Sequence, residues 1–161
     1  MSDAVDFPVP IDGRYFEDYL PGSVFEYGTV TVSEGDIIDF GRRFDPQSFH
    51  TTPAAAARGP FGGLIASGWH TASLVMRLFV DHYLSKVASL GSPGVDELRW
   101  TRPVRPGDSL RIRVFILDAR RSRSKPDRGI VWTLVEVLNQ NQEVVMSLKA
   151  MNLLRCRVAS G

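Results

Sequence analysis

The chain has 161 residues, of which 43% are hydrophobic and 23% charged, and its formal net charge is +1. This composition is that of an ordinary globular protein, and we expect residues 1–161 to form one domain with a substantial core. A net charge so close to zero gives no general attraction to nucleic acid or acidic membranes, so neither is expected as a partner. The single cysteine, Cys156, cannot form an internal disulfide, which is typical of a reducing compartment.

Residues 1–22 contain several prolines and predict an extended N-terminal arm, held to the body of the protein by Tyr15 and Phe16. The first residues lack a basic stretch followed by an apolar one, so we expect no secretory signal. The most apolar helical segment carries Arg77 and Asp81, which argues against a membrane span. The expected location is therefore cytoplasmic.

After the arm, the pattern predicts a strand over residues 24–32 and then a short helix. Ser33 is expected to cap this helix, because Glu34 and Asp36 then fall in its first turn, where the helix dipole favours acidic side chains. Residues 44–66 are too rich in proline and glycine for a regular element, so we expect an irregular loop there.

A long helix is predicted from about Ser67 to Leu84, with apolar residues around most of its circumference. Only a narrow stripe, formed by Ser73, Arg77 and Asp81, is polar. A helix this apolar must be covered on most sides, so we expect a sheet to wrap around it.

Four further strands are expected after the helix, at residues 95–104, 109–119, 130–138 and from 144 to about 150. Their apolar and polar residues alternate, which is typical of half-buried antiparallel strands. The sequence thus predicts an α+β fold in which a strongly curved antiparallel sheet wraps one long central helix. Such a sheet has free edges, and a dimer is one way to pair them.

The chemistry-bearing residues gather before the long helix. Asp45 and His50 lie five residues apart in the irregular segment, and Gly68 follows at the start of the helix. A carboxylate, an imidazole and the N–H groups of a helix N-terminus are three parts of a proton-transfer site. Taken alone, however, Asp45 before Pro46 is more commonly a turn residue, and His50 a loop histidine.

These segments resemble the MaoC-like (R)-specific enoyl-CoA hydratases, a family with the hot-dog fold. The family's hallmark is Asp-x-Asn-Pro-x-His, followed by a His-Gly pair that opens the central helix. Here residues 45–50 read DPQSFH, and residues 67–68 read SG. The resemblance extends from residues 15–18 to the ELRWTRPVRPGDSL segment at 97–110, and so covers nearly the whole chain.

The chain departs from the family pattern at four positions. Gln47 stands in place of the Asn and keeps an amide, whereas Ser48 replaces the Pro and Ser67 replaces the His. Family members commonly carry a Ser two turns past the Gly, and that position here is Met76. These departures bear on the identity of the substrate more than on the class of reaction.

The resemblance implies reversible hydration of an enoyl-CoA to a (3R)-hydroxyacyl-CoA, with coenzyme A as part of the substrate and no other cofactor. Asp45 and His50 would be the catalytic residues, sharing the activation of water and the proton transfers. The N–H of Gly68 would bind the thioester oxygen, where a side chain would block the acyl group. Further candidates for the substrate-binding surface are Gln47, Phe49, Ser67 and Trp69.

Two other functions remain open. The same fold hydrolyses acyl-CoA in hot-dog thioesterases, and some MaoC-like chains with a degraded motif are inactive acyl-CoA-binding partners of an active subunit. A homodimer or higher homo-oligomer is expected, because the family's substrate tunnel lies at the subunit interface.

Other residues have common structural explanations. The aromatic residues Phe44 and Phe61, like Phe49 and Trp69, fit an acyl pocket and an ordinary core equally well. The basic residues between Arg120 and Arg128 could meet coenzyme A phosphates, but a solvated hairpin is the more common explanation. His70 and His82 are expected to be satisfied core or surface histidines. Three histidines without a metal-ligand spacing predict no metal site.

Overall fold

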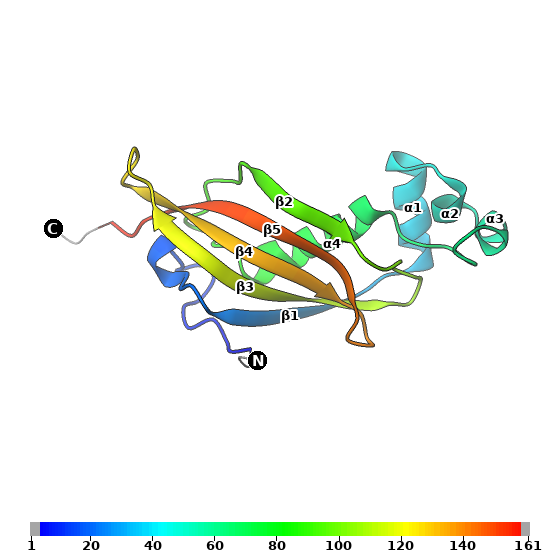
Figure 1. Ribbon diagram of the computed structural model, residues 1–161, viewed down its shortest axis with the longest axis horizontal. Coiled ribbons are helices and arrows are strands. Elements are labelled where there is room, and N and C mark those ends of the chain that lie inside the picture. Colours follow the sequence, from blue (N-terminus) through cyan, green and yellow to red (C-terminus); the bar gives the residue numbers. More distant parts are fainter. Residues whose placement is uncertain (1–3, 159–161) are drawn as a thin grey trace.

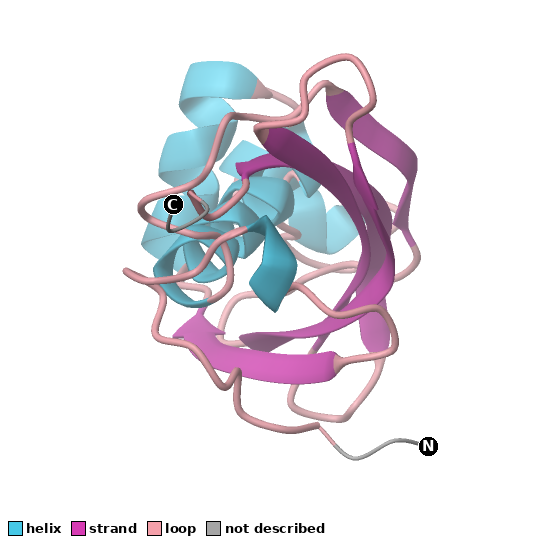
Figure 2. Ribbon diagram, turned by 90° about the vertical axis from the view of Figure 1, so that its left-hand side faces the viewer, coloured by secondary structure: helices cyan, strands magenta, loops and turns pink. Residues whose placement is uncertain are grey.

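The computed structural model describes residues 4–158 and contains one antiparallel sheet with a long helix on its concave face (Figures 1 and 2). The strand order is β1-β3-β4-β5-β2, so β1 and β2 are the edges. The strands are β1 (Val24–Thr31), β2 (Gly94–Trp100), β3 (Ser109–Arg121), β4 (Arg128–Leu138) and β5 (Val144–Arg155). The helices are η1 (Phe16–Asp18, a 3₁₀ turn), α1 (Glu34–Phe44), α2 (Ser48–Thr51), α3 (Pro53–Arg58) and α4 (Gly68–His82). The predicted α+β class is confirmed.

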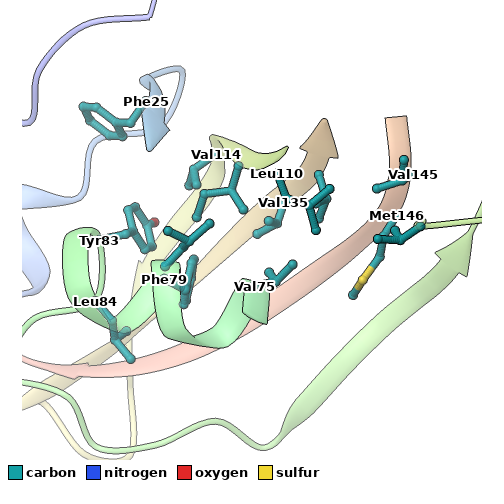
Figure 3. Close-up of a cluster of buried hydrophobic side chains, with 14 of the residues drawn as sticks. Phe25, Val75, Phe79, Tyr83, Leu84, Leu110, Val114, Val135, Val145 and Met146 are labelled. Carbon is teal, nitrogen blue, oxygen red and sulfur yellow. The ribbon is translucent and has the colours of Figure 1, made fainter. Parts of the chain in front are cut away.

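The core lies between α4 and the inner face of the sheet (Figure 3). Alternation along β3 places every second side chain inward, so that Ile112 and Val114 are fully buried, as the sequence pattern predicts. At the C-terminal end of α4, the hydroxyls of Tyr83 and Thr133 share a hydrogen bond of 2.9 Å, which satisfies two buried polar groups. The labelled core residues in Figure 3 include Phe25, Val75, Phe79, Leu110, Val135, Val145 and Met146.

The described part of the N-terminal arm, residues 4–22, is irregular apart from η1, and residues 1–3 of the predicted arm lie outside the described residues. Arg14 Nη1 donates to the Tyr83 carbonyl at 2.9 Å, and the Tyr19 hydroxyl donates to the same carbonyl at 2.8 Å. These two bonds satisfy a carbonyl at the C-terminal end of α4. The arm therefore stabilises the end of the central helix.

Three predicted boundaries differ from the structure. The segment 44–66 is not wholly irregular, because α2 and α3 form within it; Pro53 opens α3, where its missing N–H costs nothing. The strand predicted at 95–104 ends at Trp100, before Pro103, which cannot donate to a sheet. The last strand continues beyond residue 150 to Arg155.

One face of α4 stays exposed, so the expectation that the sheet covers this helix on most sides is wrong within a single chain. Trp69, Met76 and Val80 are 60%, 48% and 40% exposed. Beside them on edge strand β2, Val95 and Trp100 are 50% and 44% exposed. We call these five residues the α4–β2 patch. Contiguous apolar surface beside a free sheet edge is typical of a protein interface.

Helix α1 sets the position of α2 through a close contact at Gly41. Ser33 caps α1, as predicted, by accepting a hydrogen bond from the Asp36 N–H at 3.1 Å. Eight residues later, the buried Gly41 lies against the backbone of His50 in α2. Only glycine leaves room for this approach, so α1 and α2 are packed backbone to backbone.

Replacing Gly41 by Ala should displace α2, because the added methyl group would lie 2.9 Å from the His50 carbonyl oxygen and 3.0 Å from its Cβ. Overpacking of this kind costs about 1–3 kcal/mol of stability, which thermal unfolding would measure. Gly35 on the same helix is the matched control, since nothing lies within 4 Å of an added Cβ there. Gly35→Ala should be neutral or stabilising by up to about 1 kcal/mol. Equal losses in the two variants would contradict this account.

Candidate functional site

The candidate site forms where α1, α2 and the start of α4 meet, at the end of the molecule that carries the short helices (Figure 1). Asp45 is the C-cap residue of α1, and its N–H donates to the Gly41 carbonyl at 2.9 Å. His50 lies in α2, five residues further on. The chain turns between them, so that His50 Nε2 lies 3.2 Å from Asp45 Oδ2. The structure thus brings the predicted acid and imidazole together.

Two neutral side chains donate hydrogen bonds to the Asp45 carboxylate. Gln47 Nε2 donates to Oδ1 at 2.7 Å, and Ser67 Oγ donates to Oδ2 at 2.8 Å. The bond from Gln47 above all, together with those from Ser67 and the charge of His50, holds the pKa of Asp45 below its usual value, against the opposing effect of burial. Asp45 therefore stays ionised to lower pH than a free aspartate. The ionised Asp45 carboxylate stabilises the fold fully at pH values above the pKa of Asp45 in the unfolded chain. This stabilisation is lost as the pH falls through the lower pKa of Asp45 in the folded protein.

The imidazole of His50 is fixed in one orientation. The residue is 4% exposed, and its Nδ1 lies 2.7 Å from the Ile65 carbonyl oxygen. Because a carbonyl can only accept, Nδ1 carries a hydrogen and Nε2 is the atom that faces Asp45. Nε2 faces Asp45 Oδ2 at 3.2 Å, within reach of a hydrogen bond when a proton lies between the two atoms.

Helix α4 begins beside this pair. Ser67 is its N-cap residue, as predicted, but its hydroxyl makes no capping bond and donates to Asp45 instead. Gly68 opens the helix, so its N–H has no acceptor within the helix and its dipole favours a partial negative charge nearby. An added Cβ at Gly68 would lie 2.7 Å from Trp100 Cδ2, and Trp100 Nε1 donates to the Gly68 carbonyl at 2.9 Å. In this chain, glycine is needed to accommodate the Trp100 indole.

A mainly apolar pocket of about 370 Å³ opens in front of these groups. Of the predicted substrate-binding residues, Phe49 and Trp69 line it, whereas Gln47 and Ser67 reach it only through Asp45. The lining holds two tryptophans, six other aromatic or aliphatic residues and one cation. The full set is Asp45, Phe49, His50, Phe61, Ile65, Ala66, Gly68, Trp69, Thr71, Trp100, Thr101, Arg102, Pro103 and Val104. We name this hollow the catalytic pocket.

Sequence reasoning missed Trp100 and Arg102 as site residues. Trp100 is the last residue of β2 and Arg102 follows it, both far from the motif in sequence, and only the fold brings them to the pocket that Gly68 lines. Trp100 packs edge to face on Trp69, with ring centres 5.1 Å apart, and both rings line the pocket. Of the two aromatic residues expected either in a pocket or in the core, Phe61 lines the pocket. Phe44 is 62% exposed and lies outside it.

The remaining candidates do not join the site. The basic connection between Arg120 and Arg128 lies at the opposite end of the sheet (Figure 1), and these two arginines pair with neighbouring aspartates, as a solvated hairpin would. His82 is exposed and stacks on Tyr27. His70 is buried against Phe40 but, contrary to expectation, its Nδ1 has no hydrogen-bond partner among residues 4–158. Burial lowers its pKa, despite the opposing charge of a nearby aspartate.

The described residues contain neither a cluster of metal-ligating side chains nor a helix that could span a membrane. Nowhere between residues 4 and 158 do three or more metal-ligating side chains cluster. In the same part of the chain, every helix is too short or too polar to cross a membrane.

A family model described as "MaoC like domain" matches residues 19–137. The 3-hydroxyacyl-thioester dehydratase Z of Mycobacterium tuberculosis is 33% identical over 110 residues, covering 67% of this chain and 73% of that protein. YdeM of Bacillus subtilis, an uncharacterized protein, is 29% identical over 126 residues, covering 78% of this chain and 88% of its own length. In two longer relatives the chain spans only 36% and 39% of the length.

Solved structures give the same result at the level of the fold. A MaoC-like dehydratase from Rhodospirillum rubrum superimposes with a TM-score of 0.83 at 39% identity, covering 90% of this chain and 99% of that one. A conserved hypothetical protein from Mycobacterium tuberculosis with a double hotdog fold gives a TM-score of 0.78 at 18% identity, over 95% of this chain and 47% of its own. The hot-dog fold expected from the resemblance is confirmed.

Replacing Gln47 by Leu should raise the pKa of Asp45, because the bond from the Gln47 amide is the largest effect that lowers it. Ser67→Ala should act in the same direction. An NMR titration of the Asp45 carboxyl carbon measures both shifts without depending on activity. Thr51→Val is the matched control, since the Thr51 hydroxyl donates to the Gln47 backbone carbonyl and not to the carboxylate. An unchanged titration in Gln47→Leu would show that the amide does not act on Asp45.

Proposed function

The chain belongs to the family of MaoC-like domain proteins, and we propose that it catalyses the reversible hydration of an enoyl-CoA to a (3R)-hydroxyacyl-CoA. The observation that carries this proposal is the Asp45–His50 pair, whose facing atoms are 3.2 Å apart beside the start of α4. A carboxylate and an imidazole in contact can take a proton from one reactant atom and give one to another. Hydration of a carbon–carbon double bond requires both transfers.

The proposed reaction adds the elements of water across the double bond next to the thioester. Water held between Asp45 and His50 loses a proton to the pair as its oxygen bonds to Cβ. The electron pair of the double bond moves toward the thioester carbonyl, and Cα then receives a proton from the same pair. Dehydration is the reverse sequence. The Ile65 carbonyl holds the imidazole in place throughout.

The negative charge that develops on the thioester oxygen needs a donor in this scheme. We assign this role to the N–H of Gly68; its position in the first turn of a 15-residue helix and the place of Gly68 in the pocket lining support the assignment. Loss of one such donor costs roughly 10²–10³ in turnover in other enzymes. No cofactor beyond the coenzyme A of the substrate is needed, since every step is a proton transfer or an addition.

We further propose that the active form is a homodimer built through the α4–β2 patch. Edge strand β2 has a free side, and the exposed Trp69, Met76 and Val80 on α4 lie next to it. A second copy could pair with β2 and bury these apolar side chains in one contact. The patch borders the catalytic pocket through Trp69 and Trp100, so the partner would lie beside the substrate.

The proposed reaction predicts that the protein bleaches the ultraviolet band of at least one member of a panel of enoyl-CoA thioesters. Asp45→Asn and His50→Ala should each lower turnover by roughly 10²–10⁴-fold, the usual contribution of general acid–base groups. His82→Ala is the matched control, because His82 is an exposed histidine at the far end of α4. Circular dichroism establishes that the variants are folded.

The same assay separates the other candidate functions. Release of free thiol without selective loss of the enoyl band would favour an acyl-CoA thioesterase. Saturable binding of CoA thioesters without turnover, or turnover only with a second chain present, would favour an inactive acyl-CoA-binding partner. Turnover that persists in both Asp45→Asn and His50→Ala would refute the proposed mechanism.

The proposed dimer predicts the mass of the protein in solution. Light scattering after size exclusion should give about twice the chain mass of 17.9 kDa. Val95→Lys should shift the protein toward the monomer, because it places a charge in the middle of the apolar patch. Val158→Lys is the control, since Val158 is 85% exposed and lies outside the patch. A wild-type monomer at micromolar concentration would contradict the proposed dimer.

A further inference from the structure

A second hollow lies against α4, one to two turns beyond the catalytic pocket; we call it the distal groove. Gly68, Ala72 and Met76 follow one another at four-residue spacing, so they share one face of the helix. Gly68 lines the catalytic pocket, and Ala72 and Met76 line the distal groove. The two hollows therefore lie one after the other along the same face of α4, and Met76 lies about 12 Å from Gly68 along the helix axis.

The distal groove is apolar and small. Its volume is about 130 Å³, close to the roughly 150 Å³ of an engineered apolar cavity that binds benzene. On its inner side, Val75 of α4 and Val135 of β4 face each other across the core (Figure 3). None of its lining residues is charged; they are Ala72, Val75, Met76, Phe79, Ser92, Val95, Val135, Leu148, Ala150 and Asn152. A short aliphatic chain fits this lining, whereas a carboxylate would find no cation there.

One lining residue does not fit an apolar groove. Asn152 lies on β5, on the face turned toward α4, and is only 5% exposed. Its Oδ1 is fully buried and has no hydrogen-bond partner among the described residues. The other polar lining residue, Ser92, is satisfied, because its hydroxyl donates to the Gly94 carbonyl at 3.0 Å. A buried acceptor without a donor is costly, so the Asn152 amide points to a missing polar group.

Building on the proposed acyl-thioester function, we propose that Asn152 determines specificity by hydrogen-bonding a hydroxyl group near the distal end of the acyl chain. The unpartnered atom is Oδ1, an acceptor, so its ligand must donate a hydrogen, which a hydroxyl does. A hydroxyl also accepts from Nδ2, so it satisfies the amide in either of its two orientations. The substrate class is therefore an acyl thioester with a neutral, hydroxylated tail.

Calorimetric binding of saturated CoA thioesters tests this assignment without requiring turnover. The ligands are ω-hydroxyacyl-CoAs and methyl-terminated acyl-CoAs of about six to twelve carbons, a range that brackets the helix length between Gly68 and Met76. At the best chain length, the unaltered protein should bind the hydroxyl-terminated ligand about fivefold more tightly, the effect of one hydrogen bond. Equal affinity at every length, or no binding of either series, would overturn the proposal.

Two variants identify the residue responsible. Asn152→Leu has a similar volume without the amide, and should reverse the preference in favour of the methyl-terminated ligand. Ser92→Ala removes the other polar group of the distal groove and should keep the preference. A hydroxyl preference that survives Asn152→Leu would overturn the assignment. Should that variant not fold, Asn152→Ala also removes the amide and provides the same comparison.

The binding test is independent of the hydratase assay. Crotonyl-CoA has a chain too short to reach Met76, so its turnover reports on Asp45 and His50 alone. A hydroxyl preference without turnover of any enoyl-CoA would refute the proposed reaction and leave the role of Asn152 standing. Turnover of an enoyl-CoA without any hydroxyl preference would support the proposed reaction and refute the role of Asn152.

Discussion

The contact between Asp45 and His50 depends on groups from four different segments. The helix α1 ends at Asp45, and α2 carries His50 against Gly41. The carbonyl of Ile65 fixes the far side of the imidazole, and the Ser67 hydroxyl fixes the carboxylate. Each of these bonds involves a buried or half-buried polar atom, and breaking one would leave its partner unsatisfied at a cost of about 1–3 kcal/mol. The pair is therefore held by the same hydrogen bonds that stabilise the irregular segment.

The sheet and the central helix provide the rigid base for this segment. Backbone hydrogen bonds from Ile65 to the Phe49 carbonyl, at 3.0 Å, and from Ala66 to the Val104 carbonyl, at 2.8 Å, tie the approach to α4 to both α2 and the sheet. As a result, the first turn of α4 and the two titratable side chains keep a fixed relation. A site that transfers protons benefits from this rigidity, because its groups need no rearrangement during the reaction.

The exposed face of α4 links assembly and specificity. The central helix of a hot-dog fold has to be apolar toward its sheet, yet here it is also apolar on the other side, at Trp69, Met76 and Val80. The same helix runs from the catalytic pocket to the distal groove. In the proposed dimer, a partner that covers this face would also close the space proposed for the acyl chain. This is a physical reason for placing a substrate tunnel at a subunit interface.

Local sequence determined the elements of this protein. Alternation defines β3 and β4, Ser33 caps α1, and the apolar run after Gly68 defines α4, because these signals depend on neighbours within one or two turns. The spacing of Asp45 and His50 could be read by resemblance to a family. Tertiary structure alone decided that Ser67 donates to Asp45, that Trp100 lies on Gly68, and that the buried Oδ1 of Asn152 has no hydrogen-bond partner among residues 4–158. These contacts join residues that are 22 or more positions apart or depend on what packs around one side chain, and no local pattern specifies which distant groups a fold brings within hydrogen-bonding distance.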